Sequence, residues 1–137
     1  MSFRYSITLD LCGQKCAVIG GGSVAMRKVC SLLAAGAEVM VVSPELNEEL
    51  AEMAGQEKFL WIRDHYRDKY IAGCLLVIAA TGERETNRLI SCFCRANSIL
   101  VNSADSPKDS SFIVNAALVR GDLVVGVSTV PSLFILT

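Results

Sequence analysis

The sequence predicts an α/β domain in which a parallel sheet is flanked by helices and followed by a C-terminal β-hairpin. Three observations lead to this prediction. Five short apolar stretches of strand length alternate with segments of helical periodicity. A glycine-rich turn joins the first strand to the first helix. After residue 108 the alternation stops, and two β-rich stretches surround the turn Arg120-Gly121-Asp122, which is the pattern of a hairpin.

The first strand is expected over residues 15–19, where a continuous apolar run indicates burial on both faces. A helix is expected from Ser23 to about Ala35, with Gly36 just past its end. Its inward stripe consists of Ala25, Val29, Leu32 and Leu33.

Later elements follow from the same reasoning. Further strands are expected over 38–42, 59–62, 74–79 and 99–102. Ser43 and Pro44 have the residue types of an N-cap and a first helical position, so they predict the start of a second helix. A third helix is expected over 83–96, and its inward residues are Leu89, Ile90 and Phe93. Such βαβ units are right-handed and produce a parallel sheet.

The glycine-rich turn is the most informative local feature. Gly20, Gly22 and Ala25 fit the spacing G-x-G-x-x-A. The first glycine allows a sharp turn, the second lets the backbone approach a pyrophosphate, and the small third residue lets helix and strand pack closely. Free N–H groups at the helix N-terminus attract the anion. Because the turn falls between a predicted strand and helix, we expect a Rossmann-like nucleotide-binding domain.

Composition excludes several classes of function. The chain has 137 residues, enough for one domain with its own core. The net charge of −1, from 13 basic and 14 acidic residues, gives no reason to expect a nucleic-acid partner. We expect no membrane partner either, because no apolar run reaches the roughly 18 residues of a membrane span. The N-terminus lacks the apolar core of a secretory signal, so a cytoplasmic location is expected.

The cysteines and the histidine do not indicate a metal or disulfide site. No C-x-x-C pair occurs among the six cysteines, and most have apolar neighbours, so we expect reduced, buried side chains. Cys92 and Cys94 are two apart on a predicted helix and should point to different faces. His65 lies in a charged loop and is expected to be solvated.

Two loops at the carboxyl ends of predicted strands carry candidate functional residues. Dinucleotide folds usually end the second strand with an acidic residue that binds the adenosine ribose. Here Ser43 takes that place, and no arginine follows to accept a 2′-phosphate, which favours NAD over NADP. Asp105 follows the fifth strand and is the candidate proton acceptor, although an Asp in this position also forms turns.

These residues belong to a wider resemblance. The motifs Gly-Gly-Gly-x-Val-Ala-x-Arg-Lys at 20–28 and Asn-x-x-Asp-x-Pro at 102–107 are similar to those of the precorrin-2 dehydrogenase family, the dehydrogenase/ferrochelatase module of sirohaem synthase. The likeness spans nearly residues 3–129 in order and spacing. Other matching segments are 33–37, 41–45, 76–81, Asn87, 111–113, 120–123 and 128–129.

The resemblance implies NAD-dependent oxidation of precorrin-2 to sirohydrochlorin in sirohaem or cobalamin synthesis; some family members also insert ferrous iron. It implies a tetrapyrrole partner and a homodimer formed through the hairpin region. The catalytic aspartate of the family corresponds to Asp105. The implied cofactor contacts are Gly22, Ser23, Val24, Ser43, Pro44, Glu45, Ala80 and Thr81.

The polycarboxylate substrate could be anchored by several cations. The candidates are Arg27, Lys28, Arg84, Arg88, Lys108 and Arg120, each of which could equally be ordinary surface charge. No dedicated metal ligands are visible, so iron insertion stays open.

The predicted organisation is an NAD-binding domain at 1–110 and a hairpin and dimerisation segment at 111–137. After Ser128-Thr129 the family continues with Gly-x-Ser-Pro and long helices, whereas this chain has Val130-Pro-Ser-Leu and ends at Thr137. The final apolar stretch suggests subunit pairing or a fragment. We therefore expect NAD⁺ binding, with catalysis by the chain alone in question. The alternative function is an NAD(H)-binding regulatory module without catalysis.

Overall fold

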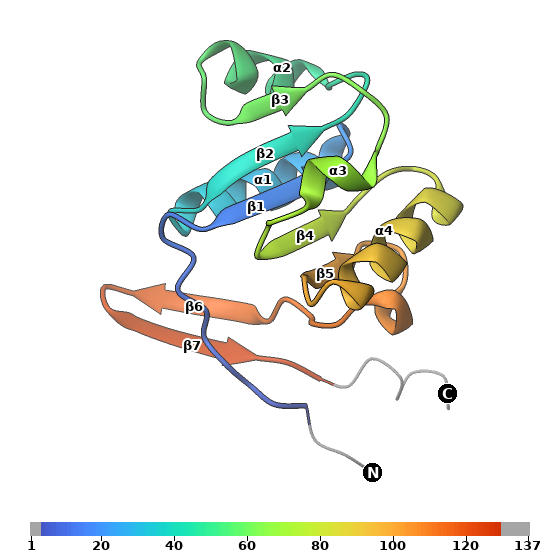
Figure 1. The fold of residues 1–137 in the computed structure, drawn as a ribbon. Coiled ribbons are helices and arrows are strands. Elements are labelled where there is room, and N and C mark those ends of the chain that lie inside the picture. The colour runs from blue at the N-terminus through green and yellow to red at the C-terminus, as the bar shows by residue number, and fades with distance from the viewer. Residues whose placement is uncertain (1–3, 130–137) are drawn as a thin grey trace.

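The computed structural model describes residues 4–129, which form a three-layer α/β unit and a separate two-stranded sheet (Figure 1). The elements of the α/β unit are β1 (Lys15–Ile19), α1 (Ser23–Ala34), β2 (Glu38–Val42), α2 (Glu48–Gly55), β3 (Leu60–Ile62), α3 (Asp68–Ile71), β4 (Leu76–Ala79), α4 (Arg84–Ala96), β5 (Leu100–Ser103) and the 3₁₀ turn η1 (Pro107–Asp109). The second sheet pairs β6 (Ala116–Arg120) with β7 (Leu123–Val127). This is the predicted fold class.

The main sheet is parallel, with strand order β3-β2-β1-β4-β5. The chain therefore reverses its direction of travel across the sheet between β1 and β4. Because ligands bind at such a switch point, outside the carboxyl ends of the strands, the topology itself marks where a site should lie. Within the described residues no helix is long and apolar enough to cross a membrane.

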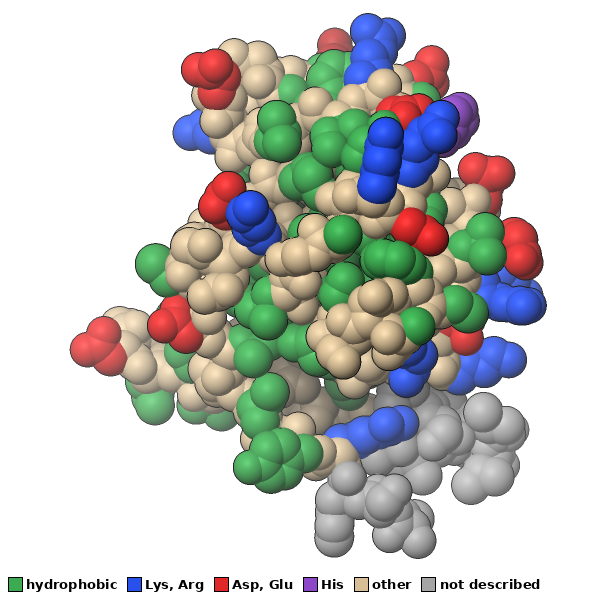
Figure 2. Space-filling view, viewed as in Figure 1, with side chains coloured by type: hydrophobic (Ala, Val, Ile, Leu, Met, Phe, Trp, Pro, Cys, Tyr) green, Lys and Arg blue, Asp and Glu red, His purple; other side chains and the backbone are tan. Residues whose placement is uncertain are grey.

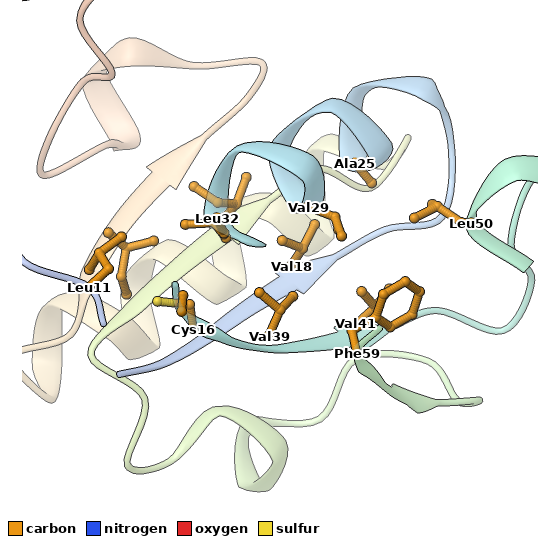
Figure 3. Close-up of a cluster of buried hydrophobic side chains, with 13 residues drawn as sticks. Leu11, Cys16, Val18, Ala25, Val29, Leu32, Val39, Val41, Leu50 and Phe59 are labelled. Carbon is orange, nitrogen blue, oxygen red and sulfur yellow. The ribbon is translucent and has the colours of Figure 1, made fainter. Parts of the chain in front are cut away.

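Alternate side chains of each strand supply the two core layers. On one face, Val18, Val39 and Val41 pack with residues of α1 and α2 (Figure 3). On the other face, Ala17 and Val77 pack with residues of α3 and α4. With both faces covered, residues 16–19 of β1 and all of β4 are buried, as continuous apolar strands should be.

The first helix agrees with its prediction. Ala25, Val29 and Leu32 are buried against the sheet, and Leu33 is partly buried beside them. The helix ends where Gly36 adopts a φ of +82°, a left-handed conformation that glycine takes without steric cost.

Two details of the other helices differ from the predictions. Leu89 is 55% exposed rather than inward-facing, because the buried stripe of α4 runs through Asn87, Ile90, Ser91 and Cys94. That stripe follows the i, i+3, i+4, i+7 spacing of a helix, and two of its members are polar, which apolar patterning does not reveal. The sequence also did not predict α3, since four residues are too few to establish a period.

The cysteines only partly fit the predicted burial. Cys16 and Cys94 are buried, Cys74 is intermediate, and Cys12, Cys30 and Cys92 are exposed; all six are free thiols. The opposite exposure of Cys92 and Cys94 confirms that they lie on different faces of α4. Burial raises the pKa of the Cys16 thiol to about 11, so it stays protonated at neutral pH.

The hairpin stands apart from the α/β unit. Its turn is formed by Gly121 and Asp122, since Arg120 pairs with Leu123, and every residue of β6 and β7 is exposed. The space-filling view shows apolar side chains along this projecting hairpin (Figure 2). The apolar stretch predicted at 130–136 lies outside the described residues.

Candidate functional site

A cleft of about 930 Å³ opens at the carboxyl ends of β1, β2, β4 and β5, beside the switch point. Nine of the ten residues singled out from the sequence line it: Gly20, Gly22, Ser23, Val24, Ser43, Pro44, Ala80, Thr81 and Asp105. Glu45 does not line the cleft, but its backbone carbonyl supports the turn that does. Residues up to 85 positions apart in the sequence are thus brought to one cavity, from Gly20 to Asp105.

The three consecutive glycines at positions 20–22 differ in what an added side chain would contact. Gly20 has a φ of +138°, and a Cβ there would lie 2.2 Å from the Ala80 carbonyl oxygen. A Cβ at Gly21 would lie 2.0 Å from the Glu45 carbonyl oxygen. A Cβ at Gly22 would meet nothing within 4 Å. The first two glycines are therefore required by the packing of the protein, whereas the third faces open space in the cleft.

The N-terminus of α1 borders that open space. Gly22 is the N-cap and supplies no side-chain hydrogen bond to the helix. The first backbone bond of the helix runs from Met26 N–H to the Gly22 carbonyl, so the N–H groups of Ser23, Val24 and Ala25 have no partner within the helix. Uncapped N–H groups and the positive end of the helix dipole make this an anion-binding position.

The loop after β2 corrects one prediction. Ser43-Pro44 does not begin a helix: the Ser43 N–H still bonds the Ile62 carbonyl at 3.2 Å, extending the strand ladder. The helix α2 begins at Glu48, and its N-cap is Asn47, whose Oδ1 accepts from Leu50 N–H at 2.9 Å. The Ser43 hydroxyl donates to the Glu45 carbonyl at 2.5 Å, which holds that carbonyl against Gly21.

The loop after β3 adds residues to the cleft that were not predicted from the sequence. Asp64, His65 and Tyr66 line the cleft on the side of Ser43. The Asp64 carboxylate accepts from Tyr70 Oη–H, from Arg67 Nε at 3.0 Å and from His65 N–H at 2.8 Å. The hydrogen bonds from Tyr70, Arg67 and His65 lower the pKa of Asp64, so it is an anion at neutral pH. His65 itself is exposed, as expected.

Asp105 is held by two hydrogen bonds at the other end of the cleft. Its Oδ1 accepts from the Ser103 hydroxyl at 2.8 Å, and its Oδ2 accepts from Asn87 Nδ2 at 3.1 Å. Slight burial raises the pKa of Asp105, but the hydrogen bonds from Ser103 and Asn87 outweigh it and lower the pKa overall. The carboxylate is therefore ionised at neutral pH and fixed in orientation while its residue remains exposed.

Asn87 is the residue that joins the loops after β4 and β5. It is 1% exposed, and its Nδ2 also donates to the Thr81 carbonyl at 3.1 Å. Its Oδ1 accepts from Thr81 N–H at 3.1 Å and from Thr81 Oγ1–H at 2.6 Å. All hydrogen-bonding groups of this buried amide are thus satisfied by Thr81 and Asp105. Asn87 belongs to the family resemblance, but no role was assigned to it from the sequence; a polar residue on the inward stripe of α4 was the available signal.

The fold and this cleft together define a dinucleotide-binding domain: a parallel sheet, a glycine turn at the switch point and an uncapped helix N-terminus above it. Comparison with known proteins gives the particular family. Residues 7–116 match the family model described as "Putative NAD(P)-binding", and the chain belongs to that family.

Curated relatives carry a more specific name. The chain is 41% identical over 123 residues to siroheme synthase of Nitrosococcus oceani, a match that covers 90% of this chain and 26% of that protein. It is 42% identical over 117 residues to siroheme synthase 2 of Aeromonas salmonicida, covering 85% of this chain and 24% of the relative. The chain therefore spans about a quarter of the length of the curated relatives it matches.

Solved structures agree with these relatives. The structure of SirC, precorrin-2 dehydrogenase, superposes with a TM-score of 0.79 at 29% identity, covering 95% of this chain and 65% of that one. A glycerate dehydrogenase related protein from Thermoplasma acidophilum, at 18% identity and a TM-score of 0.51, shares the fold. The comparisons confirm the family resemblance that the sequence indicates.

Proposed function

We propose that this chain binds NAD⁺ in the cleft and contributes to the oxidation of precorrin-2 to sirohydrochlorin. The observation that carries the proposal is the open space at Gly22, below the uncapped N-terminus of α1, in the same cleft as the ionised Asp105. The names of the siroheme synthase and precorrin-2 dehydrogenase relatives supply the substrate.

The residues of the cleft would hold the cofactor in sequence. The N–H groups of Ser23 and Val24 would bind the pyrophosphate, for which Gly22 leaves room. Ser43 and Pro44 at the end of β2 would bind the adenosine ribose. Ala80 and Thr81 would line the nicotinamide end, on the side of Asp105. Glu45 contributes through its carbonyl, which holds the turn in shape.

The adenosine end favours NAD over NADP. The single hydroxyl proton of Ser43 is donated to the Glu45 carbonyl, so its oxygen has only lone pairs to offer a ligand. These accept a hydrogen bond from a ribose hydroxyl but not from an ionised 2′-phosphate. Asp64, in the same part of the cleft, pairs with Arg67, so that this nearby arginine is not free to bind a 2′-phosphate.

The reaction removes a hydride and a proton from precorrin-2. NAD⁺, when bound, accepts the hydride and leaves as NADH. Asp105 accepts the proton at Oδ1 or Oδ2, and its exposed position lets the proton pass on to water. Ser103 and Asn87 stabilise the anionic form, so Asp105 is ready to accept a proton over the whole neutral range.

The hairpin provides a surface for a second copy of the chain. Six apolar residues of β6 and β7 are between 46% and 63% exposed: Leu118, Val119, Leu123, Val124, Val125 and Val127. A two-stranded sheet with both faces in water is marginally stable, so pairing with a partner hairpin would bury these side chains. Sedimentation equilibrium tests this part of the proposal, and a monomer at every accessible concentration would contradict it. The cytoplasmic location stays a prediction.

The decisive experiment supplies NAD⁺ and precorrin-2 without oxygen and follows the absorbance of NADH and sirohydrochlorin. The expected result is equal formation of the two products by the parent chain. Asp105→Asn should bind NAD⁺ with the parent affinity and lose turnover. Equal turnover by parent and variant would refute the role of Asp105. NAD⁺ binding by the parent without any turnover would instead support the non-catalytic NAD(H)-binding module.

A further inference from the structure

A second cleft, of about 940 Å³, adjoins the first. Its walls come from the N-terminal segment before β1, from α1, from β4 and β5 and from the segment after β5, and they include apolar side chains such as Leu9, Ile78 and Phe112. The two clefts share six residues: Lys28, Asp105, Pro107, Ser110, Ile113 and Val114. The proposed catalytic carboxylate therefore stands at the junction, reachable from both sides.

The six cations considered as substrate anchors differ in which of the two clefts they line. Arg27 lines only the first cleft, and Lys108 lines only the second. Arg84, Arg88 and Arg120 line neither. Lys28 is the one member of the six that lines both clefts, as Asp105 does, which places it at their junction.

The Lys28 side chain is also available to a ligand. Among residues 4–129 the structure contains one side-chain ion pair, between Arg67 and Asp64, so Lys28 has no acidic partner there. Partial burial lowers the pKa of Lys28, and the neighbouring charge of Arg27 lowers it further. An ammonium that has lost part of its hydration gains more from a bound anion than a fully solvated one does.

We propose that the second cleft receives the tetrapyrrole and that the Lys28 ammonium binds one of its carboxylates at the junction with the cofactor cleft. This inference rests on the proposed function and adds to it the place and the anchor of the substrate. The apolar walls suit the flat ring system, and Lys108 and Arg4 in the same cleft suit further carboxylates.

The pair of opposite charges also orients the substrate. A carboxylate is attracted to Lys28 and repelled by Asp105, so the acidic side chains of the substrate turn away from Asp105. A C–H bond of the ring can then face the Asp105 carboxylate and the nicotinamide. Lys28 is a positioning residue in this account, because it holds the substrate and takes no proton from it.

The test measures two affinities of the full chain: NAD⁺ by calorimetry, and sirohydrochlorin by equilibrium dialysis with NAD⁺ present. In Lys28→Met the unbranched side chain keeps the packing of the lysine stem and loses the charge. Its affinity for sirohydrochlorin should fall about tenfold to a hundredfold, the effect of losing one charge-assisted hydrogen bond. Its affinity for NAD⁺ should stay unchanged, and Lys28→Arg should recover most of the sirohydrochlorin affinity.

Arg88→Met is the matched control, since it removes one positive charge from an exposed residue that lines neither cleft. It should bind both ligands as the parent does. Sirohydrochlorin binding that Lys28→Met leaves intact would overturn the inference, as would a loss confined to NAD⁺, which would assign Lys28 to the cofactor. A parent chain that binds sirohydrochlorin but no NAD⁺ would refute the proposed function, but not the role of Lys28 in binding the tetrapyrrole.

Discussion

Replacing Gly22 by aspartate should weaken the binding of NAD⁺ without preventing the chain from folding. Because a Cβ at Gly22 meets nothing within 4 Å and the φ of −99° suits any L-residue, the chain should fold normally. Aspartate is moreover a good N-cap, which adds a few tenths of a kcal/mol to stability relative to glycine. The carboxylate should therefore occupy the N–H groups of α1 that the pyrophosphate would otherwise use.

The expected loss of affinity follows from the charges. Two unit charges 4 Å apart repel by about 4 kcal/mol at an effective dielectric constant of about 20. With between none and about half of that screened by water and salt, the penalty is about 2–4 kcal/mol, or a Kd for NAD⁺ raised about 30-fold to 1,000-fold. Calorimetric titration measures it directly.

Thermal unfolding gives an independent measurement. At an NAD⁺ concentration of about 100 times the parent Kd, the parent should gain about 2.7 kcal/mol, while Gly22→Asp, with its weaker binding, should gain at most about 0.9 kcal/mol. Gly22→Ser is the matched control, since it offers an N-cap hydroxyl without a charge and should lose less affinity. A folded Gly22→Asp variant that binds NAD⁺ with the parent Kd would refute the placement of the pyrophosphate at α1.

Three further predictions follow from the same contacts. Gly21→Ala should destabilise the fold by about 1–3 kcal/mol in urea unfolding, because its Cβ would lie 2.0 Å from the Glu45 carbonyl; Gly82→Ala, with nothing within 4 Å, should not. Ser103→Ala and Asn87→Leu each remove a hydrogen bond that lowers the pKa of Asp105. The acid limb of the pH–rate profile should therefore move to higher pH in both variants. An unmoved limb would contradict the role of these donors. Asp64→Asn removes an anion from the adenosine end of the cleft, so the ratio of NADP⁺ to NAD⁺ affinity should rise. An equal change for both cofactors would show that Asp64 does not face the 2′ position.

The lowered pKa of Asp105 also makes the stability of the folded chain depend on pH. Its pKa in the folded chain lies below the unfolded value, so its contribution is complete above the unfolded pKa. It is lost as the pH falls through the folded pKa. Ser103→Ala should therefore unfold more easily than the parent near neutral pH, and the difference should shrink as the solution becomes acidic.

Local patterns predicted the frame of the molecule. The spacing of Gly20, Gly22 and Ala25 depends on one turn and the helix after it, so it is visible in the sequence. Continuous apolar runs likewise predicted the parallel sheet, because strands covered on both faces have no polar side to alternate with. Asp105 was predicted to lie at the site because it comes just after the end of a predicted strand.

Tertiary contacts explain what the sequence did not predict. Gly21 is required by a carbonyl 24 positions away at Glu45, and the role of Asn87 depends on Thr81 and Asp105 from two other loops. Asp64 enters the cleft through a loop whose shape is set by Tyr70 and Arg67. Ser43-Pro44 has the composition of a helix start, but a strand bond at Ser43 and the cap at Asn47 place that start at Glu48.

A crystal structure of the chain with NAD⁺ would show directly whether the cleft is the cofactor site. We expect the pyrophosphate at the N–H groups of Ser23 and Val24, the adenosine beside Ser43, and C4 of the nicotinamide facing the Asp105 carboxylate. A nicotinamide turned toward Ser43, or NAD⁺ bound outside the cleft at Gly22, would contradict this placement.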